Sequence, residues 1–200
     1  MLLFALDLEG VFIPEIWIAV SEKMGVKELS RTTRDEPDYD KLMRYRLDIL
    51  EREKISLFDI QEVISKMRPL DGAKEFLDWL KSVGRTVILS DTFEQFAKPL
   101  MAQLDYPTLF CHSLEVDSKG KITGYKLRLS DQKKKAVEAF RSLNFEVVAS
   151  GDSYNDLSML RAANSAVLYK PTPKFAAENS DLPVAQNYAE LKTQFEKFIK

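Results

Sequence analysis

The chain has little cysteine and histidine, with 1 residue of each among 200. A single cysteine, Cys111, cannot form an internal disulfide or a cysteine-rich zinc site. Long hydrophobic runs are also missing, because no stretch approaches the ~20 apolar residues of a membrane span. The apolar start covers only about six residues and lacks a basic segment, so it is too short for a signal peptide. We therefore expect a cytoplasmic protein that does not act at a membrane.

A strong excess of one charge is absent as well. The sequence has 29 basic and 31 acidic residues, a net charge of −2, and its Lys and Arg residues are spread along the chain. This balance argues against nucleic acid or an anionic membrane as the main partner. The length of 200 residues and the 45% hydrophobic content suffice for one domain, or for a core domain with a small insert.

Short apolar runs alternate with helical patterns along much of the chain. Segments 73–84 and 132–145 repeat apolar residues at spacings of three and four, which predicts amphipathic helices. Continuous apolar strands between such helices are typical of a parallel sheet that is covered on both faces. The fold class is therefore α/β, a Rossmann-like three-layer α/β/α core. The apolar runs are residues 2–8, 86–91, 146–152 and 166–171.

Two segments interrupt this alternation. Residues 15–69 are almost entirely helical in pattern, and an insert of this length between a strand and the next helix predicts a helical cap domain. Residues 110–130 alternate polar and apolar side chains around Gly120, which predicts a small β-hairpin. The expected division is a catalytic core of residues 1–14 plus 70–200, with residues 15–69 as the cap.

Acidic and hydroxyl side chains gather where three of the apolar runs end. The first run ends at Asp7 and Glu9, the second at Ser90 and Asp91, and the third continues into "GDSYND" (151–156). Ligands of an open α/β sheet bind beyond the carboxyl ends of its strands, so these groups should meet at one site. Carboxylates in that number need a cation, and oxygen ligands without His or Cys suit Mg²⁺.

Such a site suits phosphate chemistry. Mg²⁺ held by few protein ligands usually takes a phosphate oxygen from its substrate, and a carboxylate beside it can attack the phosphorus. The charge of the transferred group must then be neutralised. Backbone N–H groups of the "LEG" turn, the hydroxyl of Ser90 and a lysine could do this, and Lys133, at the start of a predicted helix, is the best-placed lysine.

The order and spacing of these motifs resemble the haloacid dehalogenase-like phosphatase superfamily. "DLEG", "ILSDT", a lysine before an "AVEAF"-type helix and "GDSYND" match its four motifs, and the resemblance covers the whole chain. The sequence looks most similar to phosphoserine phosphatases. Within these it resembles the bifunctional branch of phosphoserine phosphatases and phosphoserine–homoserine phosphotransferases, which carries "DLEG", "PEIW", "DIQEVI" and "GDSYND" in this order.

The resemblance assigns the metal and the covalent chemistry to four acids. It implies that Asp7 is the nucleophile and a magnesium ligand. Residue Glu9 would bind magnesium through its backbone carbonyl, and its side chain would act as general acid and base. Asp152 would be the second side-chain ligand, and Asp156 would support the metal through its ligands.

The same resemblance assigns the phosphate ligands. Ser90 and the backbone N–H of Asp91 would bind the phosphate, and Asn155 would contact it as well. Lys133 would bridge the nucleophile and the phosphoryl group. The choice of Lys133 among the three lysines 133–135 depends on the resemblance.

For the cap, the resemblance implies an amino-acid substrate, O-phospho-L-serine. Glu15 would bind its ammonium group and Arg46 its carboxylate, which Arg can bind with two hydrogen bonds. The acceptor would be water or L-homoserine, and a homodimer is plausible. Two positions depart from the family pattern. Phosphoserine phosphatases usually have Asp at the position of Glu9, and Glu15 lies one residue closer to the nucleophile than the equivalent acid does.

Two other functions remain open at this point. The substrate could be another small phosphate monoester, since the chemistry would be the same. Alternatively, the chain could be a non-catalytic phosphoacceptor module, because receiver domains also place acids, a hydroxyl and a lysine around Mg²⁺. A receiver phosphorylates an acid later in its chain and has no helical insert. We expect no chemical role for His112 and Cys111.

Overall fold

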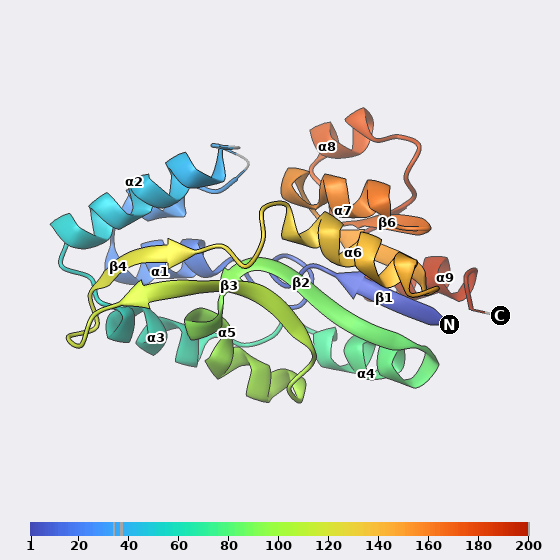
Figure 1. Cartoon of the computed structure of the whole chain (residues 1–200), viewed down its shortest axis with the longest axis horizontal. Helices are drawn as coiled ribbons and strands as arrows, with labels where there is room; N and C mark the ends of the chain where they lie inside the picture. Colours follow the sequence, from blue (N-terminus) through green and yellow to red (C-terminus); the bar gives the residue numbers. More distant parts are fainter. Residues whose placement is uncertain (34, 37, 200) are drawn as a thin grey trace.

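Seven strands form one sheet in the computed structural model, which describes residues 1–33, 35–36 and 38–199 (Figure 1). Their order is β4-β3-β2-β1-β5-β6-β7, and every neighbouring pair is parallel except β3 and β4. The strands are β1 (Leu2–Leu6), β2 (Arg85–Phe93), β3 (Leu109–Val116), β4 (Ile122–Lys126), β5 (Glu146–Gly151), β6 (Ser165–Tyr169) and β7 (Val184–Ala185).

Both faces of the sheet are buried under helices, which confirms the predicted α/β class. Along β1, Phe4 and Leu6 pack into one hydrophobic cluster, while Leu3 and Ala5 pack into a second cluster on the other face. The helices are α1 (Ile16–Met24), α2 (Tyr39–Arg52), α3 (Leu57–Lys66), α4 (Ala73–Val83), α5 (Glu94–Met101), α6 (Gln132–Ser142), α7 (Leu157–Ala162), α8 (Pro173–Glu178) and α9 (Tyr188–Glu196), with 3₁₀ turns η1 (Lys27–Ser30), η2 (Ala102–Leu104) and η3 (Tyr154–Asp156).

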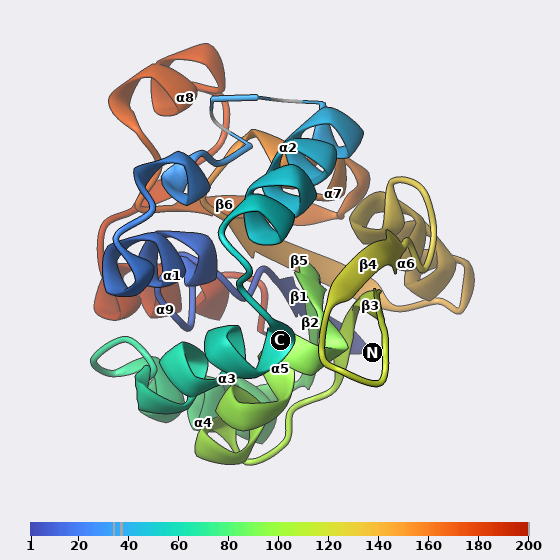
Figure 2. The ribbon, with the colours of Figure 1, turned by 90° about the vertical axis from the view of Figure 1, so that its left-hand side faces the viewer.

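Three helices lie beyond the carboxyl ends of the central strands. Figures 1 and 2 show α1, α2 and α3 around the ends of β1, β2 and β5, and we call these three the cap helices. Asp38 is the N-cap of α2, because its side chain accepts the Lys41 N–H, and α3 is preceded by Ser56, which forms a capping box with Asp59. That residues 15–69 form a separate domain stays a proposal. Within the predicted division, Arg34, Pro37 and Lys200 lie outside the described residues.

The predicted hairpin is present, and it is joined to the main sheet. Strands β3 and β4 pair antiparallel, and Gly120 in their connection has a φ of +84°, a conformation that favours glycine. Strand β3 also pairs in parallel with β2, so the hairpin continues the sheet toward the cap helices. Strand β2 itself runs beyond the predicted 86–91 to Phe93, which places Ser90 and Asp91 inside the strand. Among the described residues, no helix has the length and apolar character that crossing a bilayer requires.

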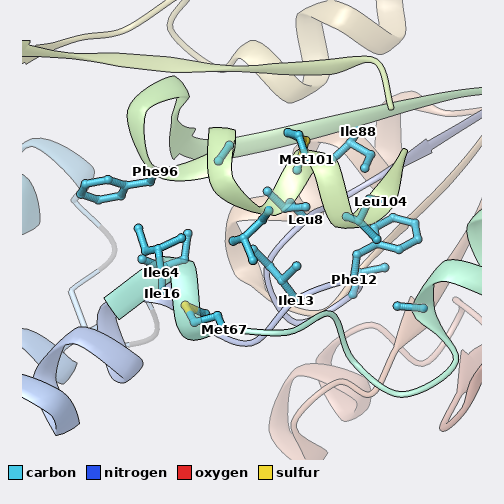
Figure 3. Close-up of a cluster of buried hydrophobic side chains, with 14 of the residues drawn as sticks. Leu8, Phe12, Ile13, Ile16, Ile64, Met67, Ile88, Phe96, Met101 and Leu104 are labelled. Atoms are coloured by element: carbon cyan, nitrogen blue, oxygen red, sulfur yellow. The ribbon is translucent and has the colours of Figure 1, made fainter. Parts of the chain in front are cut away.

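The segment that follows β1 is anchored by apolar side chains. Leu8, Phe12, Ile13 and Ile16 are fully buried in a cluster with residues of α3, α5 and η2 (Figure 3). Each of these side chains is removed from water and contributes roughly 1.5–3 kcal/mol when fully buried. This packing fixes the backbone on both sides of Glu9. The position of Glu9 relative to the sheet is therefore fixed as well.

Candidate active site

Asp7, directly after β1, is bound by a buried lysine. Lys133 Nζ donates to Asp7 Oδ1 at 2.8 Å and to Asp156 Oδ1 at 2.7 Å. The backbone N–H of Leu8 also donates to Asp7 Oδ1 at 2.8 Å. Both donors bind the same carboxylate oxygen, so Oδ2 carries neither of these hydrogen bonds. Lys133 lies in the first turn of α6, and the structure therefore brings together residues that are 126 positions apart.

The "GDSYND" segment folds into a tight capped turn. Ser153 and Asp156 form a reciprocal capping box around η3, which explains why Asp, Ser and Asn follow β5 here. Asp156 Oδ2 accepts the backbone N–H groups of Asp152 at 3.0 Å and Ser153 at 3.2 Å. The turn thus places the Asp156 carboxylate within hydrogen-bond distance of Lys133 and brings Asp152 close to Asp7.

Three buried carboxylates form a candidate cation site. Oxygen atoms of Asp7, Asp152 and Asp156 all lie within 4.8 Å of one another. Residue Gly10, with a φ of +76°, closes the site from the loop after β1, and a Cβ added there would lie 2.7 Å from Asp152 Oδ2. The backbone thus approaches these carboxylates more closely than any side chain would permit. The donor set consists of carboxylate oxygens, which suit a hard divalent cation.

The charges of this cluster shift the pKa values of its members. Burial and the neighbouring carboxylates of Asp156 and Asp152 raise the pKa of Asp7 well above its usual range, although Lys133 opposes this. Burial disfavours the charge of Lys133, but Asp156, Asp7 and Asp91 outweigh it and raise the pKa of Lys133. The lysine therefore stays protonated. The remaining excess of negative charge is the electrostatic feature that favours binding a divalent cation here.

Glu9 lies between the cluster and the cap helices. Its Oε2 accepts the backbone N–H of Ile16, the first residue of α1, at 2.8 Å. Burial and the nearby charge of Glu15 raise the pKa of Glu9 from 4.5 to about 7, while Arg46 and a hydrogen bond from Thr92 act against this rise. A carboxyl group with a pKa near neutrality can both accept and release a proton, as a general acid–base requires.

Arg46, on α2, lines the same pocket as Asp7 and Glu9. Its side chain is buried, Nη2 donates to the carbonyl of Arg31 at 2.7 Å, and the guanidinium carbon lies 4.4 Å from the ring centroid of Trp17. Burial lowers the pKa of Arg46 to about 10, although Tyr39, Glu9 and Glu15 act against this. Its Nε is buried without a hydrogen-bond partner among the described residues. An unpaired buried donor is costly, and an anionic ligand would satisfy it.

Asp91 and Asn155 bind one another across the sheet end. The Asn155 amide donates to Asp91 Oδ2 at 3.1 Å, and its oxygen accepts from the Ser153 hydroxyl at 2.6 Å. Burial alone would raise the pKa of Asp91, but Lys133, His112 and Asn155 hold it well below its usual range. Ser90, in β2, is buried and its Oγ accepts the Thr92 N–H at 3.2 Å.

The structure places the predicted site residues together. All but two line a single pocket between the sheet and the cap helices, and the remaining two, Lys133 and Asp156, pack directly behind Asp7. The roles expected for these residues stay predictions. The predicted residues that line the pocket are Asp7, Glu9, Glu15, Arg46, Ser90, Asp91, Asp152 and Asn155.

Sequence reasoning missed several residues of this pocket and its walls. Trp17 and Thr92 line the pocket although no sequence motif gives them a role, and none is expected for His112. Gln132 precedes the predicted lysine but makes its own buried hydrogen bond to Ser90. Tyr39 donates its hydroxyl to the carbonyl of Asp91 at 2.8 Å. A polar residue directly beside a motif residue is the signal in the sequence that could have indicated Thr92 and Gln132.

The fold and the pocket at its strand ends are those of an α/β hydrolase, and the family comparison agrees. Residues 4–164 match the family model of haloacid dehalogenase-like hydrolases. The chain belongs to this family, as the four sequence motifs predicted.

Two similar proteins come from Pseudomonas. Phosphoserine phosphatase ThrH of Pseudomonas aeruginosa is 50% identical over 192 residues, covering 96% of this chain and 94% of the relative. A phosphoserine phosphatase of Pseudomonas syringae pv. tomato is 49% identical over 192 residues, with 96% and 81% coverage. A solved phosphoserine phosphatase with bound substrate superimposes with a TM-score of 0.79 at 21% identity, covering 99% of this chain and 98% of that chain. This structural likeness shows the shared fold.

Proposed function

We propose that this protein is a Mg²⁺-dependent phosphoserine phosphatase that also transfers the phosphoryl group to homoserine. The observation that carries the proposal is the position of Asp7. This carboxylate is bound to Lys133 at 2.8 Å, lies within the three-acid cluster, and lines the same pocket as Arg46 and Glu15. The pocket thus combines groups for a phosphate with groups for the two charges of an amino acid. The names of the two Pseudomonas relatives support the substrate.

In the first step, a carboxylate oxygen of Asp7 would attack the phosphorus of phosphoserine. A new P–O bond forms to Asp7 and the bond to the serine oxygen breaks. Glu9, with its pKa raised to about 7, would give its proton to the leaving serine oxygen. Lys133 and the side chains of Ser90 and Asn155 would balance the charge of the phosphoryl oxygens.

In the second step, Glu9 would act in the opposite direction. It would take a proton from water or from the hydroxyl of homoserine, whose oxygen attacks the phosphorus and releases Asp7. Arg46 would hold the carboxylate of the amino acid, and Glu15 would hold its ammonium group. The same two residues suit phosphoserine and homoserine, because both carry an α-carboxylate and an α-ammonium group.

Mg²⁺ is the cation that we propose for the acidic cluster. Asp7 and Asp152 would bind it through carboxylate oxygens and Glu9 through its backbone carbonyl, with Asp156 holding Asp152 and Lys133 in place. A bound Mg²⁺ would supply positive charge to the phosphate oxygens. Carboxylate ligands with no His or Cys among the described residues of the cluster favour Mg²⁺ over softer metals.

Phosphorus NMR of a single incubation tests the proposal. The protein is mixed with phosphoserine and MgCl₂, with and without homoserine, and inorganic phosphate and phosphohomoserine are measured. We expect phosphate in both samples and phosphohomoserine only with homoserine. Asp7→Asn should lower both products on the order of 10⁴-fold or more, because the nucleophile is lost. Asp78→Asn, an exposed acid on α4, is the matched control and should leave both products unchanged.

Each part of the proposal has its own contrary result. Turnover of other monoesters but not of phosphoserine would indicate a different substrate. Phosphate without phosphohomoserine would leave a phosphatase that uses water alone. Full activity of Asp7→Asn would remove the aspartyl-phosphate step, and no release from any monoester would favour a phosphoacceptor module.

A further inference from the structure

The side chain of Gln132 is hydrogen-bonded to the backbone of β2 at Ser90. Its side chain is buried, and Nε2 donates to the carbonyl of Ser90 at 2.5 Å. Its Oε1 accepts from Arg128 Nε at 3.0 Å, which fixes the direction of the amide. Gln132 begins α6, one residue before Lys133. The helix that carries the lysine is therefore hydrogen-bonded to the strand that carries Ser90 and Asp91.

His112, the single histidine, holds the neighbouring side chain. Its Nδ1 accepts the backbone N–H of Arg128 at 3.1 Å, so the ring proton lies on Nε2. That Nε2 lies 3.5 Å from Asp91 Oδ1, and the ring is buried at 4% exposure. A histidine on β3 thus presents a donor to a carboxylate on β2.

The Asp91 carboxylate in turn contacts Asn155 and Lys133. Its Oδ2 accepts the Asn155 amide at 3.1 Å and lies 3.8 Å from Lys133 Nζ. Its backbone carbonyl also accepts the Tyr39 hydroxyl from α2. The Ser90–Asp91 corner is therefore held from the core by Gln132 and His112 and from the cap helices by Tyr39.

We propose that His112 and Gln132 are positioning residues for phosphate binding. Gln132 sets the backbone at Ser90 and also donates to Asp91 Oδ1 at 3.4 Å, while His112 sets the same Asp91 carboxylate and, through it, the amide of Asn155. Neither side chain lines the pocket that contains Asp7, and both line a neighbouring cavity that shares Asp91 and Asn155 with it. Their hydrogen-bond partners on the pocket side are Ser90 and Asp91, through which both act. The inference rests on the proposed phosphatase function, and it adds residues from β3 and the start of α6 to that site.

The alternative is that both residues only stabilise the fold, and substrate comparison separates the two cases. Displaced phosphate ligands affect every phosphate monoester, whereas Arg46 contacts only substrates with a carboxylate. We expect His112→Leu and Gln132→Met to lower kcat/KM about 10-fold for both phosphoserine and p-nitrophenyl phosphate. Inhibition by inorganic phosphate should weaken by a similar factor. Arg46→Lys should affect phosphoserine alone.

Two further variants test whether the effect passes through Asp91. His112→Gln keeps an acceptor for the Arg128 N–H and a donor for Asp91, and should restore most of the activity. In an Asp91→Ala background, His112→Leu should cause no further loss, because the group it positions is gone. Cys111→Ala, the buried neighbour on β3, is the control and should keep native activity.

Several results would overturn the inference. One is an unchanged kcat/KM in both His112→Leu and Gln132→Met, and another is a loss of kcat/KM confined to phosphoserine. The third is that the losses from Asp91→Ala and His112→Leu are additive when the two substitutions are combined. If His112→Leu does not fold, His112→Gln and Gln132→Met decide the question by the same comparison. If the native protein hydrolyses neither substrate, the proposed function fails, and calorimetry of inorganic phosphate with the same variants still tests the positioning.

Discussion

Trp17 and Arg46 are stacked on one another in the pocket, and this stacking fixes the position of the guanidinium group. The guanidinium lies over the indole at 4.4 Å, and Phe96 packs edge-on against the same indole with 5.5 Å between ring centroids. One face of the guanidinium is thus covered, and the Arg31 carbonyl occupies Nη2. The orientation of the remaining donors is set by these contacts, because a planar group that is stacked on one face and bound at one end cannot rotate freely.

This stacking predicts a substrate-selective effect of Trp17. Trp17→Leu should raise KM for phosphoserine about 3- to 30-fold, which corresponds to the loss of a partly desolvated cation–π contact. KM for p-nitrophenyl phosphate, which has no α-carboxylate, should stay the same. Steady-state kinetics with both substrates measure the effect, and Trp17→Phe is the control that retains an aromatic face. Equal changes for both substrates would mean that Trp17 supports the pocket as a whole.

The residues that sequence reasoning found and missed differ in a physical way. Asp7, Ser90 and Asp152 could be located because each lies at the end of an apolar run in the sequence, and the topology of parallel sheets brings such positions together. His112 and Trp17 could not, because their roles depend on contacts between elements far apart in the chain. His112 lies next to the Asp91 carboxylate because β3 pairs with β2, and no local pattern in the sequence predicts that pairing.

Among the connecting segments, the loop from Asp7 to Gly10 is held at several points. Gly10 takes a φ of +76°, its N–H donates to the Ile13 carbonyl at 2.8 Å, and its Cα faces the Asp152 carboxylate. The apolar cluster of Figure 3 anchors the chain on both sides. At Gly10 the loop therefore borders the acidic cluster with backbone atoms, while Asp7 contributes its carboxylate to that cluster.

Gly10→Ala should weaken cation binding as well as the fold. A Cβ in this left-handed conformation costs about 1 kcal/mol, and its 2.7 Å approach would also displace the Asp152 carboxylate. Gly25→Ala is a matched control, since Gly25 has a φ of +70° with nothing within 4 Å of an added Cβ. In EDTA both variants should lose the backbone contribution of about 1 kcal/mol, and Gly10→Ala should lose more because Asp152 must also move. Only Gly10→Ala should bind Mg²⁺ more weakly, by at least about 10-fold in calorimetry.

Equal Mg²⁺ affinity in the two glycine variants would show that the loop can relax away from Asp152.

At the scale of the helices and strands, the sequence predicts part of the fold. The four apolar strands, the helices at 73–84 and 132–145, the helical insert and the hairpin follow from periodicity, and each lies near its expected position. Strand β7 and helices α5, α7, α8 and α9 were not predicted. The extension of β2 through Ser90 to Phe93 was not predicted, because its pairing with β3 shifts register between Leu89 and Phe93 and polar residues usually end a strand.

For the whole molecule, charge is distributed unevenly despite a net charge of only −2. Most ion pairs among the described residues lie at the surface, where each contributes little. The site instead buries several carboxylates beside Lys133 and Arg46, so folding concentrates negative charge where the strands end. The free energy of unfolding should therefore depend on the protonation of the site. The homodimer expected from the family resemblance stays a prediction.

Glu9 allows this dependence to be measured with one substitution. Burial raises its pKa from 4.5 to about 7 in the folded protein. Because the folded pKa is the higher one, proton binding stabilises the fold fully below pH 4.5, and this contribution is lost as the pH rises through 7. Allowing for partial exposure of the side chain, we expect the loss to be about 2 kcal/mol.

Glu9→Gln should therefore be more stable than the native protein at pH 8, by about 2 kcal/mol, and nearly equal to it at pH 5. The amide is neutral at both pH values and can still accept the Ile16 N–H. Urea unfolding in EDTA at the two pH values measures the difference, and the contributions of other acids cancel between the two proteins. Glu22→Gln, at an exposed position on α1, should show no such pH dependence. A native protein that is the more stable one at pH 8 would mean that the Ile16 N–H, Arg46 and Thr92 outweigh the cost of burying the ionised Glu9.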